Sequence, residues 1–322
     1  MSHAIGIDLG GTNLKMLAIA PEGKVLAQRL APHVARGRGW MQNVRRTFDQ
    51  LNGMLPHPPQ WIGVAAPGLP ARDHQSIAHM PDRLPGLEGM VWRRFLRVKH
   101  GVPVVNDAKA ALMGEVWRGA ARGAQNALLI TLGTGVGGAA MVDGRVLHGH
   151  IGRAGHFGHM SLDPEGTPDI VNTPGSLEAA IGDCTVKTRT AGQFESTKEL
   201  LRACSRGDAH ARRAWLKSVR ALAAAIASLV NVLDPQVVVI GGGIAKAGAA
   251  LFNPLNNYLT EFEWRPAGHK ARIVPAKLGD RAGAFGAAWN AMQRFPANIS
   301  ERQGLGVLHG WLMKVKSRAL AD

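Results

Sequence analysis

The feature that most constrains the fold of this 322-residue chain is a pattern that occurs twice along it. Each copy has a short apolar segment, a glycine-containing turn, a second apolar segment, a tight turn and a third apolar segment, which is typical of strands joined by hairpin turns. The apolar segments are 4–7, 14–20 and 25–30 in the first copy, and 127–132, 139–142 and 145–148 in the second. Aligning the copies sets Asp8-Leu9-Gly10 against Thr131-Leu132-Gly133. The repeat predicts two α/β domains of common origin that face each other across a cleft.

The rest of the chain adds helices and strands to both copies. Hydrophobic spacing and turn residues predict one set of helices and one set of strands. The predicted helices are 40–55, 108–118, 209–233 and 282–293, and the predicted strands are 61–66, 102–105, 237–240 and 272–275. We expect Gly283 and Gly286 to let the last helix pack closely, and 69–87 to be a loop. The basic segment 296–322, with an amphipathic stretch at 305–315, predicts no function.

Composition removes several classes of protein. Hydrophobic residues make up 46% of the chain and charged residues 19%, which is ordinary for a globular protein with a large core. No run of about 18 apolar residues predicts a membrane span, and the N-terminal residues do not resemble a secretory signal. Two cysteines, Cys184 and Cys204, cannot build a disulfide framework or a four-thiolate zinc site. We therefore expect a cytoplasmic protein.

The net charge of +15 raises the question of an anionic partner. Nucleic acid, an anionic membrane surface and anionic ligands all attract such a chain. The basic residues are spread along the sequence, aromatic residues are only 5%, and no aromatic RNA-binding strand or Cys/His finger accompanies them. A scattered, solvated surface charge is the simpler interpretation. We expect neither a membrane nor a nucleic acid as partner, although a nucleic-acid-associated protein stays open as a third hypothesis.

The glycine-rich turns are candidate phosphate sites. Gly133-Thr134-Gly135-Val136-Gly137-Gly138 matches the dinucleotide-binding string, but a strand follows it where that site needs a helix. Its exposed backbone N–H groups can still approach phosphate oxygens, although a tight turn without a ligand is an alternative. The turn 8–13 adds the carboxylate of Asp8 and the hydroxyl of Thr12, which suit Mg²⁺ and phosphate. Gly241-Gly242-Gly243 follows an apolar strand and is a third place where the backbone can approach a ligand closely, here the adenosine part of a nucleotide.

Taken together, these motifs resemble those of the ROK family of sugar kinases over residues 4–292. The matching segments are Asp8-Leu9-Gly10-Gly11-Thr12-Asn13, Asn106-Asp107-Ala108, Gly114-Glu115, 132–138, Gly158-His159-Met160, Gly175-Ser176-Leu177-Glu178, 233–243 and 278–283. The resemblance implies a two-lobed actin-like ATPase fold, related to ribonuclease H, with a mixed sheet in each lobe and a ligand cleft between them. It also implies ATP-dependent phosphorylation of a sugar hydroxyl, with ATP and Mg²⁺ required, and a homodimer.

The resemblance assigns roles to individual residues. Asp107 stands at the position of the catalytic base, and Asn106 beside it is expected to bind the sugar. A helix N-cap is the alternative for Asp107, and the two roles are compatible. Glu178 stands at the position of a sugar-binding carboxylate, with a surface glutamate or one at the start of a helix as the alternative. Asp8 is expected to hold Mg²⁺ through water. The expected nucleotide contacts are Asp8, Gly10, Gly11, Thr12, Asn13, Gly133, Thr134, Gly135, Gly241, Gly242 and Gly243.

Two departures from the family pattern concern the sugar side. The family usually has a glutamate in Gly-Glu-Ile-Gly-His-Met, and here that position is His156 in Gly155-His156-Phe157-Gly158-His159-Met160. We expect the hydroxyl pattern of the sugar to differ accordingly. Many members also carry three cysteines that bind a structural zinc together with the histidine. Asp169, Val171 and Ser176 stand at those positions, so we expect no zinc, and His159 is retained for sugar contact or loop packing.

The first hypothesis is therefore a sugar kinase with a small lobe over 1–118, joined by a C-terminal helix within 291–322, and a large lobe over 119–290. His156 and the missing cysteines leave open a second hypothesis, a catalytically weak sugar- or nucleotide-binding regulatory protein of the same fold. The first predicted strand starts at Ala4, so we expect no helix-turn-helix domain before it and no repressor. The residues do not specify which sugar is phosphorylated, which of its hydroxyls reacts, or whether polyphosphate can serve as the phosphate donor.

Overall fold

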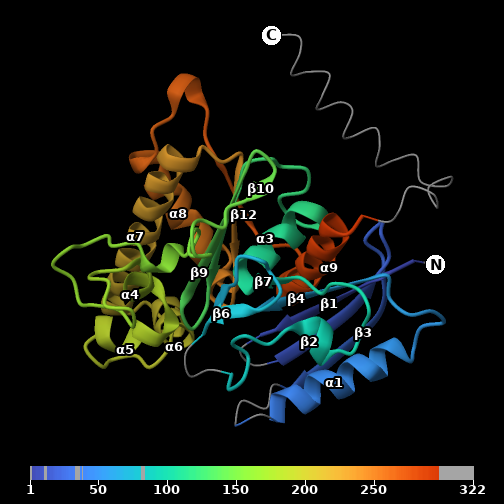
Figure 1. Ribbon diagram of the computed structural model, residues 1–322. Coiled ribbons are helices and arrows are strands. Elements are labelled where there is room, and N and C mark those ends of the chain that lie inside the picture. Colours follow the sequence, from blue (N-terminus) through green and yellow to red (C-terminus); the bar gives the residue numbers. More distant parts are fainter. Residues whose placement is uncertain (1, 11–12, 33–36, 38, 81–83, 297–322) are drawn as a thin grey trace.

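The two repeat copies form two five-stranded mixed sheets of the same order. A computed structural model describes the chain except residues 1, 11–12, 33–36, 38, 81–83 and 297–322 (Figure 1). The first sheet has the order β3-β2-β1-β4-β7 and the second β10-β9-β8-β11-β12. The strands of the first are β1 (Ala4–Leu9), β2 (Asn13–Ile19), β3 (Val25–Pro32), β4 (Trp61–Ala66) and β7 (Val104–Asn106). Those of the second are β8 (Ala127–Leu132), β9 (Val136–Val142), β10 (Arg145–Val146), β11 (Val237–Gly241) and β12 (Arg272–Pro275).

The pairing within each sheet confirms the repeat. The first three strands of each copy are antiparallel, and the two later strands run parallel to the first one. Asp8 pairs with Lys15 across the first hairpin, and Thr131 pairs with Gly137 at the corresponding place in the second. The carboxyl ends of β1, β4 and β7 therefore share one edge, as do those of β8, β11 and β12.

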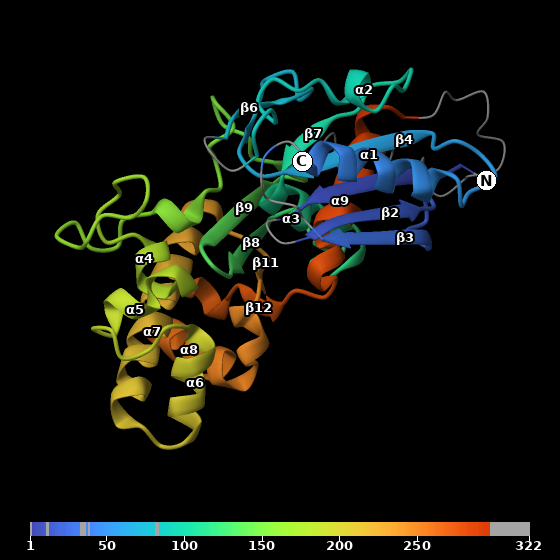
Figure 2. The ribbon, with the colours of Figure 1, turned by 90° about the horizontal axis from the view of Figure 1, so that it is seen from below.

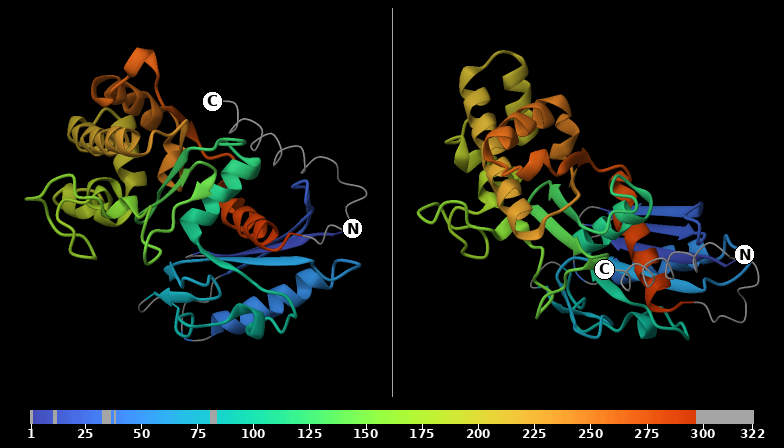
Figure 3. Two further views of the ribbon diagram at one scale, coloured as in Figure 1. Left: turned by 45° about the horizontal axis from the view of Figure 1, so that its top comes forward. Right: turned by 90° about the horizontal axis from the view of Figure 1, so that it is seen from above.

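Helices cover both sheets in layers. Helix α1 (Gly39–Asn52) packs on the outer face of the first sheet, whereas α3 (Asp107–Arg118) and α9 (Ala282–Arg294) lie between the two sheets (Figure 3). Helix α9 contacts β1 and β4, and α3 contacts β8 and β9. The outer face of the second sheet is covered by α4 (Leu177–Ile181), α6 (Thr197–Ser205), α7 (Ala209–Leu233) and α8 (Ala249–Phe262), which Figure 2 shows gathered at the end away from the first sheet. The short helices α2 (Trp92–Phe95) and α5 (Val186–Arg189) and several 3₁₀ turns complete the described chain.

Glycines bring the central helices against the first sheet. Gly6 and Gly63 are partners in neighbouring strands, and a Cβ on either would overlap a backbone carbonyl of α9. A Cβ on Gly286 would likewise overlap the carbonyl of Ala110 in α3. The expected close packing of α9 is confirmed, and it extends to the sheet beneath the helix. Residues 282–294 therefore pack on the first sheet, whereas the lobe boundaries after 118 and 290 stay predictions.

One prediction for the first lobe was wrong. The segment 69–87, expected to be a loop, contains a small two-stranded sheet formed by β5 (Leu69–Pro70) and β6 (Ile77–His79). Its turn is closed by the backbone N–H of Ala71, which donates to Ser76 over 3.0 Å. Ile77 is fully buried in the core of this lobe, and that burial holds the hairpin in place.

Within the described part of the chain, α7 is the one helix long and apolar enough to cross a membrane by length and composition alone. Its apolar face packs into the core of the second lobe with α4, α6 and α8. Val219, Leu222 and Ile226 are fully buried there. This packing accounts for the apolar composition of the helix.

Candidate active site

Asp8 places a carboxylate at the end of β1, where it is only 8% exposed. Burial raises the pKa of this carboxyl to about 7, nearby Lys15 lowers it in part, and the negative charges of Asp107 and Asp280 raise it further. Lys15 reaches this place from β2 and forms an ion pair of 3.6 Å with Asp280. Three carboxylates thus share one small region, which favours a cation or a proton there.

Asp107 opens helix α3, directly after β7. It is half-buried, and one of its oxygens accepts a hydrogen bond of 2.8 Å from the backbone N–H of Ala108. The positive end of the helix dipole stabilises its negative charge. Asp107 is not the cap of this helix, because Asn106 fills that position: its side-chain oxygen accepts from Ala108 at 3.0 Å and from Lys109 at 3.3 Å.

The cap role also limits what Asn106 can offer a sugar. Its amide group donates to the carbonyl of Gly68 over 3.2 Å, and the residue is only 5% exposed. Its oxygen is therefore engaged by the helix. The expected sugar contact would have to use the second amide hydrogen, so the main observed task of Asn106 is to fix the start of α3 and with it Asp107.

The start of α3 also contacts β9 and the loop before His156, both in the second lobe. Its Ala108 lies beside Gly137 of β9, since a Cβ on that glycine would be 3.6 Å from the Ala108 side chain. Lys109, one residue further, is fully buried and donates over 2.6 Å to the carbonyl of Gly152 in the loop before His156. Asp107 is thereby held among β1, β9 and the loop that carries His156.

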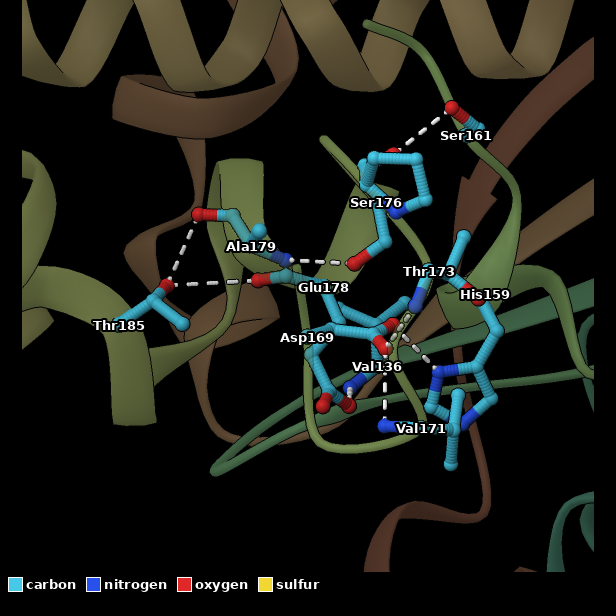
Figure 4. Close-up of polar contacts among 11 residues, drawn as sticks. Val136, His159, Ser161, Asp169, Val171, Thr173, Ser176, Glu178, Ala179 and Thr185 are labelled. Carbon is cyan, nitrogen blue, oxygen red and sulfur yellow. Dashed lines mark hydrogen bonds and ion pairs between the residues drawn. The ribbon is translucent and has the colours of Figure 1, made fainter. Parts of the chain in front are cut away.

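The second glycine turn, between β8 and β9, is held by hydrogen bonds with α4 and with the segment that follows it. The N–H groups of Asp183 and Cys184 donate to the carbonyls of Gly133 and Thr134, each over 2.9 Å. The N–H of Val136 donates to the carboxylate of Glu178 over 2.8 Å (Figure 4). A Cβ on Gly135 would overlap the same carboxylate, so a side chain there would displace Glu178 from Val136. The turn is thus a fixed feature, prepared before any ligand binds.

A cavity of about 670 Å³ opens beside this turn, and Gly133, Thr134 and Gly243 line it together. Its walls also include Lys198 and Arg202 from α6 and Lys246 from the 3₁₀ turn after β11; sequence reasoning did not assign these three basic residues to the site. One face of α6 carries Lys198, Leu201, Arg202 and Ser205 at helical spacing, which is the signal that could have found the basic residues. Such a cavity suits a nucleotide, with the base enclosed and basic groups near its phosphates.

The other predicted nucleotide contacts that the structure describes do not line this cavity. Gly10 and Asn13 flank the turn between β1 and β2, while Gly11 and Thr12 lie outside the described residues. Gly241 ends β11, next to β8. Gly242 has a φ of +87°, and a Cβ on it would overlap the backbone of Leu132, so it brings the two strand ends together rather than lining the cavity.

The predicted sugar residues gather around β9. A 3₁₀ turn (Phe157–His159) packs against this strand so closely that a Cβ on Gly158 would overlap the carbonyl of Val136. Just before the turn, His156 donates its Nδ1–H to the carbonyl of Arg153 over 3.0 Å, which leaves Nε2 as an acceptor when the ring is neutral. Burial lowers the pKa of His156, and the charge of Lys109 lowers it further. A neutral ring at this position therefore keeps an acceptor, as a glutamate would.

His159 ends this 3₁₀ turn, and Glu178 belongs to α4, which contacts the turn. His159 donates its Nδ1–H to Asp169 over 2.8 Å, and its side chain is 28% exposed. Glu178, in the first turn of α4, is only 7% exposed. Among the described residues, no group of three or more His, Cys, Asp or Glu side chains is arranged to hold a metal ion.

Comparisons with known proteins agree with this geometry. A profile described as the ROK family matches residues 4–294. A glucokinase from Halalkalibacterium halodurans is 32% identical over 320 residues, covering 90% of this chain and 95% of that protein. The ROK hexokinase from Thermus thermophilus has a TM-score of 0.78 at 29% identity, covering 91% of this chain and 98% of its own. A ROK family glucokinase from Streptomyces griseus, solved with glucose and AMPPNP, has a TM-score of 0.73 at 25% identity, covering 91% of this chain and 100% of its own.

Proposed function

The chain belongs to the ROK family and is an ATP-dependent sugar kinase of the actin-like ATPase fold, and we propose that Asp107 is the general base of its reaction. The observation that carries this assignment is the position of Asp107. It stands at the start of α3, at the charged edge of the first sheet, beside β9 and the loop of His156. A carboxylate there can accept the proton of a sugar hydroxyl while the phosphoryl group is transferred to that oxygen.

The nucleotide is proposed to lie in the cavity beside the second glycine turn. The N–H of Gly133 closes the turn by donating to the carbonyl of Gly135 over 3.0 Å, so the N–H and hydroxyl of Thr134 would face the phosphates. Lys198, Arg202 and Lys246 would supply positive charge. Asp8, with Asp107 and Asp280 close enough to raise its pKa, fits a place next to the Mg²⁺ of MgATP. That cation would balance the charge of the phosphates and of these carboxylates.

The sugar is proposed to lie between Asp107 and the group formed by His156, His159 and Glu178. A buried carboxylate and two ring nitrogens can accept hydrogen bonds from neighbouring hydroxyls. The Streptomyces griseus relative was solved with glucose, which makes glucose the first sugar to test. The positive charge of the chain would suit polyphosphate as a second donor. A cytoplasmic location and a homodimer stay part of the proposal.

The test is the release of ADP from MgATP over hexoses, hexosamines and ketoses, repeated with polyphosphate as donor. Asp107→Asn removes the base, and we expect kcat to fall by about 10²–10⁴-fold. Asp49→Asn makes the same change on the exposed side of α1 and should leave kcat unchanged. Equal turnover by Asp107→Asn and wild type would contradict the assignment. Tight sugar binding without turnover by the wild-type protein would favour the regulatory alternative.

A further inference from the structure

The loop that would hold the zinc of the family does not fit that metal. A structural zinc site needs four ligands, which are thiolates, imidazoles or carboxylates. Of the positions where many members carry cysteines, one holds Val171, which has no donor atom and is 52% exposed, and another holds Ser176. The hydroxyl oxygen of Ser176 accepts from the N–H of Ala179 as the cap of α4. Asp169 and His159 alone cannot complete a four-ligand site.

The carboxylate of Asp169 stands at one of these cysteine positions and organises the loop. The side chain of Asp169 is only 1% exposed. One oxygen accepts from His159 over 2.8 Å, and the other accepts from the backbone N–H groups of Val171 over 2.9 Å and Thr173 over 3.0 Å (Figure 4). Burial raises the pKa of Asp169, but hydrogen bonds from His159, Thr173, Val171 and Ser176 together lower it below its usual value. The loop is thus organised around one anionic group with several donors.

The backbone closes the same loop without help from a metal. Asp169 donates its N–H to the carbonyl of Thr173 over 2.9 Å. At the base of the loop, Leu162 donates to Gly175 over 2.9 Å and Leu177 donates to Met160 over 3.0 Å. These bonds join the segment after His159 to the segment before Glu178.

The contact of Asp169 toward the sugar region is the ring of His159. Because His159 gives its Nδ1–H to the carboxylate, the ring is fixed with Nε2 on its opposite edge, as an acceptor in the neutral form. The start of α4 has hydrogen bonds of its own, since Ser176 caps it by accepting from Ala179 and Glu178 accepts from Val136. Removing the carboxylate of Asp169 would therefore release the His159 ring and leave Glu178 in place.

We propose that Asp169 is a positioning residue that takes over the task of the zinc: it orients His159, so that sugar binding in this chain is independent of zinc. The proposal rests on the proposed sugar-kinase function. It acts on the affinity for sugar, because Asp169 bonds to His159, Val171 and Thr173 in its own loop and does not line the nucleotide cavity. Its effect should therefore appear in the sugar KM rather than in the KM for ATP.

The test compares Asp169→Ala and Asp169→Asn with Asp163→Asn, a matched control at an exposed aspartate of the same loop. We expect Asp169→Ala to raise the sugar KM and the sugar Kd about tenfold or more, since an unpaired imidazole loses its fixed orientation. The KM for ATP should stay within about twofold. Asp169→Asn keeps an acceptor and should have a smaller effect, which covers the case that the alanine variant does not fold. Asp163→Asn should match the wild type.

Two further measurements separate positioning from general loss of stability. The variant Asp169→Ala with His159→Ala should have the same sugar Kd as His159→Ala alone, because Asp169 acts largely through that ring. Wild-type protein treated with a chelator and returned to Mg²⁺ should keep its sugar Kd and Tm, with no stoichiometric zinc by elemental analysis. One zinc per chain whose removal weakens sugar binding, or an unchanged sugar Kd in both Asp169 variants, would overturn the proposal. If the wild type neither binds nor phosphorylates any sugar, the proposed function itself fails.

Discussion

The carboxylate of Glu178 accepts a hydrogen bond of 2.8 Å from the backbone N–H of Val136. Val136 directly follows Gly135 in the turn between β8 and β9, and Glu178 belongs to the proposed sugar site. One side chain therefore touches the sugar region and the turn proposed for the phosphates. The binding of one substrate should influence the binding of the other through this contact.

Replacing Glu178 should weaken the binding of both substrates. In Glu178→Ala the N–H of Val136 loses its partner, so we expect KM to rise about tenfold for ATP as well as for the sugar. Glu178→Gln keeps an acceptor for Val136 and should mainly raise the sugar KM. Steady-state kinetics with each substrate varied in turn measures both values, with Glu165→Ala at an exposed position as the control. An unchanged KM for ATP in Glu178→Ala would argue against the coupling.

Asp8→Asn should stabilise the free protein while it inactivates the enzyme. The pKa of Asp8 is raised to about 7 in the fold, so the folded state holds a proton that the unfolded state releases near pH 4. Ionising the buried carboxyl of Asp8 therefore lowers the free energy of unfolding progressively from about pH 4 to pH 7, and the loss stays constant above that range. At pH 8 the variant should gain roughly 2–4 kcal/mol in free energy of unfolding. At pH 3 it should match the wild type.

Both effects of Asp8→Asn can be measured on one preparation. Urea unfolding at the two pH values gives the stability, and ADP release gives kcat, which we expect to fall about a hundredfold or more. A variant less stable than the wild type at pH 8 would show that the charge of Asp8 is compensated in the fold.

Gly283→Ala should disturb Asp8 directly. A Cβ at this position in α9 would lie 2.6 Å from a carboxylate oxygen of Asp8, so the helix or the carboxylate must shift. We expect kcat to fall at least about tenfold, while circular dichroism still shows a folded protein. Gly53→Ala is the control, because a Cβ there has its nearest neighbour at 3.4 Å. Full activity in Gly283→Ala would mean that the position of Asp8 is not critical.

The sugar KM should depend on pH through His156. Burial and the charge of Lys109 lower its pKa below the usual value of about 6.5, so the ring is neutral at pH 7 and Nε2 accepts. As the pH falls through this lowered pKa, protonation turns Nε2 into a donor, and the sugar KM should rise. In His156→Gln this rise should be absent, whereas His150→Gln, at an exposed histidine of the same loop, should retain it. A rise that persists in His156→Gln would assign the effect to another group.

Local patterns in the sequence were sufficient for much of the fold. The two hairpins, the strands parallel to them and α7 were predicted because apolar periodicity and glycine turns act over a few residues. Helix α6 was missed, although Ser196 followed by Glu199 is a capping pattern, and Ser196 accepts from Glu199 over 3.2 Å.

Helix α8 was missed for a reason that lies elsewhere in the chain. Pro254 stands inside it and removes the N–H that would bond to Ala250 four residues earlier. The carbonyl of Ala250 instead accepts from the indole N–H of Trp215 in α7 over 2.9 Å. A tertiary partner thus satisfies the group that the proline leaves open, and no local pattern could have indicated it.

In the candidate site too, local motifs were sufficient for some residues, whereas others depend on tertiary contacts. Asp107 and Glu178 were assigned from contiguous motifs, and their roles in the reaction stay predictions. The role of Asp169 depends on His159, ten residues earlier and across a folded loop, and the basic lining of the nucleotide cavity comes from α6 and from the turn after β11. Asn106 was expected to serve the sugar, but the fold uses its oxygen to cap α3.

The packing of α9 against Gly6 and Gly63 has a consequence for the order in which the protein is made. The first sheet is built from residues 4–106, but one of its faces is covered by residues 282–294. During synthesis from the N-terminus, that apolar face, with Ala4 and Trp61, is already complete while its cover has not yet left the ribosome. The last strand of the second sheet, β12, is made just before α9, so the face of the first sheet stays uncovered while nearly all of the second lobe is made. A chain that stops before α9 would present an open sheet face to the cell's chaperones and proteases.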